Sequence, residues 1–150
     1  MDQPFHTNSV NFSENIYEQA VVRLLQSSNS LQGKLQKYLT PFNLTIQQFN
    51  ILRILKDVSE PVSLCKIKEM MIYKMPDTSR LVKRLADKGL LHRHSCCNDK
   101  RLIDIALTER GRALVSEVDQ LLPHYTTSLF STLSDEECRQ LCRLLDKVSK

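Results

Sequence analysis

The sequence predicts a mainly α-helical chain with a small β-hairpin, an α+β fold class. Only three glycines occur in 150 residues, which favours helices joined by short connections. Apolar residues recur at helical spacing through most of the chain. The segment 103–107 instead alternates with the period of two that a strand requires. The length fits one domain with its own core.

A long helix is expected first, after a loose arm at residues 1–12. From Tyr17 to Tyr38, apolar or small residues recur in alternating steps of four and three, which marks one side of a helix. Ser13 is the expected cap, and Pro41 follows the expected end. A helix of this length needs an apolar surface to lie on, which either an intramolecular core or another subunit could supply.

Three shorter helices are expected between residues 45 and 89, each with its own start or stop signal. Thr45 and Gln48 form a capping box, and Ser63 is placed to cap the next helix. Pro76 suits the first position of the third helix, and Gly89 suits the left-handed residue just past its end. Because a short turn joins the last two helices, they indicate a helix-turn-helix.

The third of these helices has an apolar face and a charged face. Leu81, Val82 and Leu85 form the apolar face. The charged residues on the other side are Asp77, Arg80, Lys83, Arg84 and Asp87.

This helix also lies in the most basic part of the chain. The segment 74–101 holds eight lysines and arginines against three aspartates, whereas the whole chain has a net charge of +4. Such a segment is typical of a surface that faces a polyanion, although a solvated charged face would explain the charge alone.

A β-hairpin is expected directly after the basic helix. Leu90–Ser95 is short and extended, and the polar tip Cys96–Arg101 follows it. Ile103, Ile105 and Leu107 then alternate with other residues in the return strand. A hairpin in this position is the wing of a winged helix-turn-helix.

Two more helices are expected after the hairpin. Thr108 can cap the first, and Pro123 should kink or end it. Ser134 and Glu137 form a second capping box, which starts the last helix. The residues that share one side of that last helix are Cys138, Leu141, Leu145 and Val148.

The order of these elements, and one stretch in particular, resembles the MarR family of transcription regulators. The stretch is Asp99–Gly111, DKRLIDIALTERG. It matches the family's pattern of Asp-x-Arg in the wing, alternating apolar residues in the return strand, and then Leu-Thr-x-x-Gly. Upstream, Thr78–Leu85 followed by Lys88–Leu90 looks like the family's recognition helix and its exit. The resemblance covers residues 15–148.

The resemblance implies a homodimeric repressor that binds double-stranded operator DNA in a sequence-specific manner. Residues 1–150 would form a single chain of this type. Dimerisation helices are expected at 13–40 and 109–150, and the winged helix-turn-helix DNA-binding domain is expected at 45–108.

By this resemblance, the recognition helix enters the major groove, where base edges display distinguishable donors and acceptors. Thr78, Ser79 and Arg80 lie in its first turns and are expected near bases. Lys83 and Arg84 are better placed for phosphates.

The wing is expected in the adjacent minor groove, whose negative potential attracts an inserted arginine. Arg101 matches the family's wing arginine. Asp99 would orient an arginine through a charge-assisted hydrogen bond, or would only shape the turn. Lys100 would contact a phosphate.

Cys96 and Cys97 at the wing tip suggest one way in which such a regulator could be controlled. Basic neighbours would favour the thiolate, so oxidation at the tip is one hypothesis. Metal binding by His92, His94 and Cys96 is another, because alternate residues of a strand share a face.

A small organic ligand between the dimerisation and DNA-binding parts is a third hypothesis. Tyr38, Phe42 and Phe49 could line such a pocket, or could pack in the core. Two cysteines four residues apart on the last helix could share an ion, but core filling is favoured for them and for a third cysteine. The three are Cys138, Cys142 and Cys65.

Other classes of function fit the sequence less well. The chain has no Gly-rich phosphate loop, no His-Glu-x-x-His and no Gly-x-Ser-x-Gly motif, so neither enzyme activity nor a cofactor is expected. A winged helix that binds only protein is the other alternative, and it would lack the basic face and the wing arginine. No apolar run approaches the roughly 18 residues of a membrane span. Since the N-terminus also lacks the order of a signal peptide, a cytoplasmic protein with reduced thiols is expected.

Overall fold

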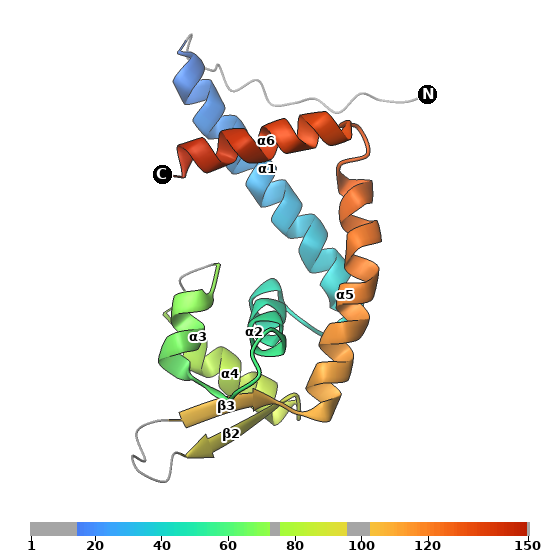
Figure 1. Ribbon diagram of the computed structural model, residues 1–150. Helices are drawn as coiled ribbons and strands as arrows, with labels where there is room; N and C mark the ends of the chain where they lie inside the picture. The colour runs from blue at the N-terminus through green and yellow to red at the C-terminus, as the bar shows by residue number, and fades with distance from the viewer. Residues whose placement is uncertain (1–14, 73–75, 96–102, 150) are drawn as a thin grey trace.

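The computed structural model describes residues 15–72, 76–95 and 103–149 (Figure 1). The elements of this part of the chain are, in order, α1 (Ile16–Leu39), η1 (Thr40–Phe42), α2 (Ile46–Lys56), β1 (Val62–Ser63), α3 (Leu64–Met70), α4 (Thr78–Asp87), β2 (Leu91–Ser95), β3 (Ile103–Leu107), α5 (Glu109–Leu129) and α6 (Asp135–Val148). The predicted fold class is confirmed. Figure 1 shows the sheet at one end of the molecule and α6 at the other, with α5 running between them.

The first helix, α1, begins and ends with side-chain and backbone caps. Asn15 is its N-cap, and the Oδ1 atom of Asn15 accepts the Tyr17 N–H at 2.9 Å. The predicted cap, Ser13, lies outside the described residues. After the short turn η1, Asn43 takes a left-handed φ of 55°. There the Leu44 N–H donates back to the Leu39 carbonyl at 3.3 Å, a closing bond typical of helix C-termini.

The centre of the small winged domain is α2, which contacts α1, α3, α4, α5 and β3. The predicted capping box of Thr45 and Gln48 is present at its start. Ile51 and Leu52 are fully buried, because α2 is enclosed by the other helices and the sheet. The core of the described residues therefore sits around this helix.

The predicted start is correct for α3 and wrong for α4. Ser63 caps α3 as predicted, since its hydroxyl accepts the Lys66 N–H at 3.2 Å. The prediction that Pro76 occupies the first helical position of α4 is wrong. The N–H groups of Arg80 and Leu81 both donate to the Asp77 carbonyl, so the helical bonds begin at Asp77 and the helix begins at Thr78.

The predicted hairpin is confirmed, and in the described residues it belongs to an antiparallel sheet with the order β1-β3-β2. Arg93 in β2 pairs with Ile105 in β3, and Val62 in β1 pairs with the same residue from the other side. The sequence analysis did not predict β1, because two residues are too few for a periodic pattern.

The helix α5 leaves the sheet at Thr108, whose hydroxyl accepts the Gly111 N–H at 2.9 Å, as predicted for a cap. Pro123 lies inside α5, which continues to Leu129. The predicted alternative that Pro123 ends the helix is therefore wrong.

The last helix, α6, starts with the predicted capping box of Ser134 and Glu137. None of the described residues of α6 is buried, and Leu141, Leu144, Leu145 and Val148 are exposed apolar side chains. Among the residues that the structure describes, no helix combines the length and the apolar character needed to cross a membrane.

Candidate nucleic-acid interface

The helix α4 presents a basic face to solvent. Four of the predicted site residues, Ser79, Arg80, Lys83 and Arg84, are exposed on it. Their opposite face is anchored in the core, where Val82 and Leu85 are only 2% and 0% exposed. Figure 1 shows α4 on the same end of the molecule as the sheet.

An ion pair within this face is weak. Arg80 Nη1 lies 3.5 Å from Asp77 Oδ2, and both side chains are more than 60% exposed. Exposed pairs of this kind contribute about 0–1 kcal/mol, so the pair leaves Arg80 available to a polyanion.

Thr78 is the one residue of the predicted helix contacts that the structure contradicts. Thr78 is 0% exposed, and its hydroxyl donates to the sulfur of Met71 at 3.7 Å. Residues four apart lie on the same face of a helix, and Val82, four residues later, is buried as well. Thr78 therefore belongs to the core side of α4, not to the exposed basic side.

The exit from α4 is held rigidly. Gly89 has a φ of 71°, the left-handed conformation predicted for it. The Leu90 N–H donates to the Leu85 carbonyl at 3.0 Å, and the Thr108 hydroxyl donates to the Gly89 carbonyl at 2.8 Å. These bonds set the position of the hairpin relative to α4.

The hairpin strands lead toward the predicted wing tip. Ser95 of β2 pairs with Ile103 of β3, which is the last pair before the tip. The predicted site residues of the tip lie outside the described residues, so their roles stay predictions. They are Cys96, Cys97, Asp99, Lys100 and Arg101.

The described residues contain no group of three or more His, Cys, Asp or Glu side chains placed to hold a metal ion. The predicted set of His92, His94 and Cys96 is not tested, because it extends beyond those residues. Core filling is wrong for Cys65 and Cys142, which are exposed since their helices turn these positions to solvent.

The aromatic side chains considered for an organic ligand pack against each other and the core. Tyr38 of α1 stacks on Tyr125 of α5 with ring centroids 4.4 Å apart and also contacts Phe42. Its hydroxyl donates to the Val118 carbonyl at 3.2 Å. Burial, with smaller contributions from the Asp119 carboxylate and Tyr125, raises the pKa of Tyr38 above its ordinary value.

Comparisons with known proteins give this site its context. The model of the MarR family matches residues 44–103, which include α2, α3, α4 and β2. The chain is 28% identical to the apo form of wild-type MarR from E. coli, with a TM-score of 0.69 over 84% of this chain and 94% of that one. A cysteine-to-serine mutant of E. coli MarR complexed with operator DNA is 25% identical, with a TM-score of 0.76 over 89% of this chain and 98% of that one. The MepR–DNA complex from S. aureus is 26% identical, with a TM-score of 0.73 over 87% and 94% of the two chains.

The predicted resemblance to the MarR family of transcription regulators is confirmed, by the family model over residues 44–103 and by the similar solved structures.

Several polar contacts between distant segments of the described chain were not predicted from the sequence. Asp119 of α5 accepts from Lys56 Nζ at 2.7 Å and from Arg53 Nε at 3.3 Å, which ties α5 to α2. Lys88, just after α4, reaches the start of α2. Helical periodicity separates apolar from polar positions but does not pair a polar side chain with a partner elsewhere in the chain.

Proposed function

We propose that this chain is a sequence-specific regulator of transcription that binds double-stranded DNA as a homodimer and represses from its operator. The observation that carries the proposal is the two-sided α4. Its core side is buried at Val82 and Leu85, while Arg80, Lys83 and Arg84 are exposed on the other side. A helix held in this way can enter the major groove with its basic side chains free to meet bases and phosphates.

The relatives support DNA as the partner. Two solved structures that are similar over more than four fifths of this chain are complexes with DNA, one of them with operator DNA. In our proposal α4 lies in the major groove, and the segment between β2 and β3 carries Arg101 to the neighbouring minor groove.

The exposed apolar side chains at the other end of the chain support a homodimer. Tyr17 and Val21 on the first half of α1 are 79% and 58% exposed, and Val148 on α6 is 75% exposed. An open groove between α1 and α6 is lined by Leu24, Leu31, Leu141 and Leu145, among others. We propose that a second copy covers these surfaces, with residues 13–40 and 109–150 as the dimerisation part and 45–108 as the DNA-binding domain.

The experiment that tests this function is a binding titration at several salt concentrations. The wild-type protein first selects its preferred duplex from random-sequence double-stranded DNA. If a dimer neutralises about 6–10 phosphates, affinity for the selected duplex should fall by roughly three to five powers of ten between about 50 and 200 mM salt. Failure to enrich any sequence, or an affinity that does not respond to salt, would contradict the proposal.

We further propose a small molecule or an oxidant as the effector of this regulator, acting in the cytoplasm. The same titration with peroxide, and separately with a chelator, tests the two hypotheses made for the wing tip. Loss of binding with peroxide and recovery with thiol would support Cys96 and Cys97. Unchanged binding under both treatments would favour an organic ligand.

A further inference from the structure

A chain of polar contacts connects the end of α1 with the end of α4. It involves Gln36 of α1, Asn43 in the turn before α2, Gln48 in the first turn of α2, and Lys88 just after α4. Lys88 is half-buried, whereas Lys83 one turn and a half earlier is exposed. These two lysines of one basic segment therefore have different environments.

The ammonium group of Lys88 is directed toward the turn that precedes α2. Its Nζ atom donates to the Asn43 carbonyl at 2.5 Å and lies 3.4 Å from the Oε1 atom of Gln48. The backbone of Lys88 is itself fixed, because its N–H donates to the Arg84 carbonyl and Gly89 closes the helix in the left-handed conformation. The position of α4 is thereby linked to the turn that precedes α2.

The acceptors of Lys88 are held in place from the other side. Gln48 is 4% exposed, and its Oε1 atom also accepts the Thr45 N–H at 3.1 Å. Gln36 of α1 then bridges the same turn, since its Nε2 atom donates to the Leu44 carbonyl at 3.0 Å and its Oε1 atom accepts the Ile46 N–H at 3.2 Å. Hydrogen bonds therefore run from α1 through the start of α2 to the end of α4.

We propose that Lys88 is a positioning residue, which sets the orientation of α4 relative to α1 and so the seating of the recognition helix on its operator. The inference rests on the proposed function. In a homodimer joined through α1 and α6, the orientation of α4 relative to α1 decides whether both recognition helices meet successive major grooves together. A lysine that binds oxygen atoms of its own chain contributes to that fit without neutralising a phosphate.

The test compares Lys88→Met with Lys83→Met on the duplex that the wild-type protein selects. We expect Lys88→Met to lower affinity about tenfold while the slope of affinity against salt stays unchanged, because no phosphate contact is lost. Lys83→Met should reduce that slope by about two, because the dimer loses one phosphate contact in each subunit. Lys88→Arg, which keeps donors for the two acceptors, should bind within about threefold of the wild type.

A double-mutant cycle with Gln36→Met tests whether the contacts act as one unit. Both changes interrupt the same series of hydrogen bonds between α1 and α4. The double variant should therefore bind the duplex about as tightly as whichever single variant has the lower affinity. Unfolding by denaturant shows whether each variant is folded. If Lys88→Met does not fold, the test uses Lys88→Arg instead.

Two results would overturn the inference while leaving the proposed function intact. A slope reduced by about two in Lys88→Met would make Lys88 a phosphate contact in each subunit, and an unchanged affinity would give it no part in binding. Wild-type protein that selects no duplex would instead overturn the proposed function and this inference with it.

Discussion

Gly111 of α5 faces the backbone carbonyl of Leu90 so closely that a Cβ atom on Gly111 would lie 2.1 Å from that oxygen. The same carbonyl accepts the Thr108 N–H at 3.1 Å. Since Leu90 joins α4 to β2, this approach brings the end of α4, the hairpin and the start of α5 together. Only a residue without a side chain permits it.

We therefore expect Gly111→Ala to destabilise the protein by about 1–3 kcal/mol, because the backbone must shift to relieve the overlap. Gly33→Ala is the matched control. Gly33 is exposed inside α1, and a Cβ atom there would meet nothing within 4 Å, so alanine should stabilise the helix by up to about 1 kcal/mol. Equilibrium unfolding by denaturant measures both, and equal effects of the two changes would contradict the role given to Gly111.

Much of this architecture could be predicted, because its signals are local. The caps at Thr45, Ser63, Thr108 and Ser134 each depend on residues no more than three positions away. The left-handed conformation of Gly89 likewise depends on that residue's own backbone. The residues that form local hydrogen bonds of this kind stand at a fixed spacing, so the sequence predicts these bonds.

The features that were not predicted depend on partners far along the chain. Helical spacing placed Thr78 beside Arg80 at the start of the recognition helix, but only the packing of Met71 against α4 puts Thr78 in the core. The contact of Lys88 with Asn43 joins residues 45 positions apart, and no periodic pattern in the sequence reveals it. The segment and most of its two faces could therefore be predicted, whereas the burial of Thr78 could not.

The buried position of Thr78 gives a prediction for the recognition helix. Thr78→Val changes a side chain on the core side of α4, so affinity for the selected duplex should stay within about twofold of the wild type. Arg80→Ala removes an exposed cation from the opposite face and should weaken binding by about 1–3 kcal/mol. Titration of the duplex at fixed salt measures both. Stronger loss in Thr78→Val than in Arg80→Ala would contradict the assignment of faces.

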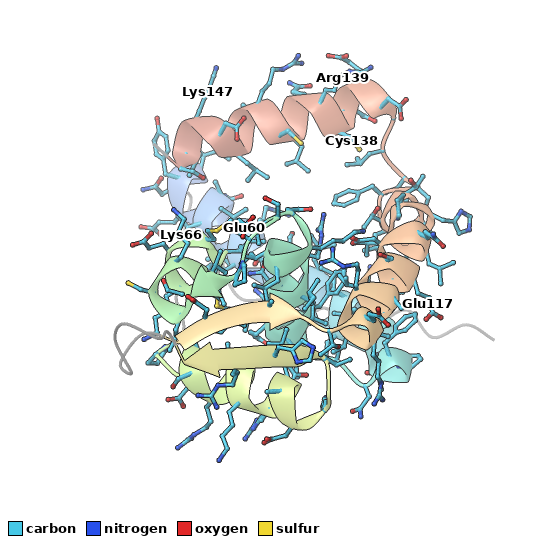
Figure 2. All side chains as sticks on the ribbon, turned by 60° about the horizontal axis from the view of Figure 1, so that its bottom comes forward. Glu60, Lys66, Glu117, Cys138, Arg139 and Lys147 are labelled. Carbon is cyan, nitrogen blue, oxygen red and sulfur yellow. The ribbon has the colours of Figure 1, made fainter. Side chains whose placement is uncertain are left out.

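The wing arginine is tested by Arg101→Ala. We expect weaker binding of the duplex, about tenfold, with the dimer intact, because a guanidinium in the minor groove is lost. Lys147→Ala is the control, since Figure 2 shows Lys147 on the side of α6 turned away from the rest of the chain. Affinity that is the same for Arg101→Ala and Lys147→Ala would remove Arg101 from the interface.

The proposed dimer surface on α6 is tested by introducing a charge. Leu141 lines the groove between α1 and α6, so Leu141→Glu would place an unpaired carboxylate where the second copy packs. We expect the dimer to weaken by at least about 2 kcal/mol, more than tenfold in its dissociation constant. Gln140→Glu adds the same charge to the neighbouring exposed position and should leave the dimer unchanged. Sedimentation equilibrium measures both, and equal association of the two variants would exclude this face from the interface.

The capping box of α6 predicts a dependence of stability on pH. Glu137 accepts the Ser134 N–H at 2.8 Å and the Ser134 hydroxyl at 2.9 Å, and these bonds hold the pKa of Glu137 below its ordinary value of 4.5. Arg143 and Arg139 lower the pKa of Glu136 in the same way. Because the unfolded chain takes up these protons first, the stabilisation is present above the ordinary value and is lost as pH falls through the lowered pKa values.

We expect the melting temperature of the wild type to fall between about pH 5 and pH 3 more steeply than that of Glu137→Gln. Glutamine keeps an amide oxygen for the Ser134 N–H but does not titrate, so the capping box survives while its dependence on pH is removed. The double change Glu136→Gln with Glu137→Gln should flatten the curve further. All three proteins are compared at one concentration, since association of subunits also shifts the melting temperature. Parallel curves for the wild type and both variants would show that the lowered pKa values of Glu136 and Glu137 add no pH-dependent stability to the fold.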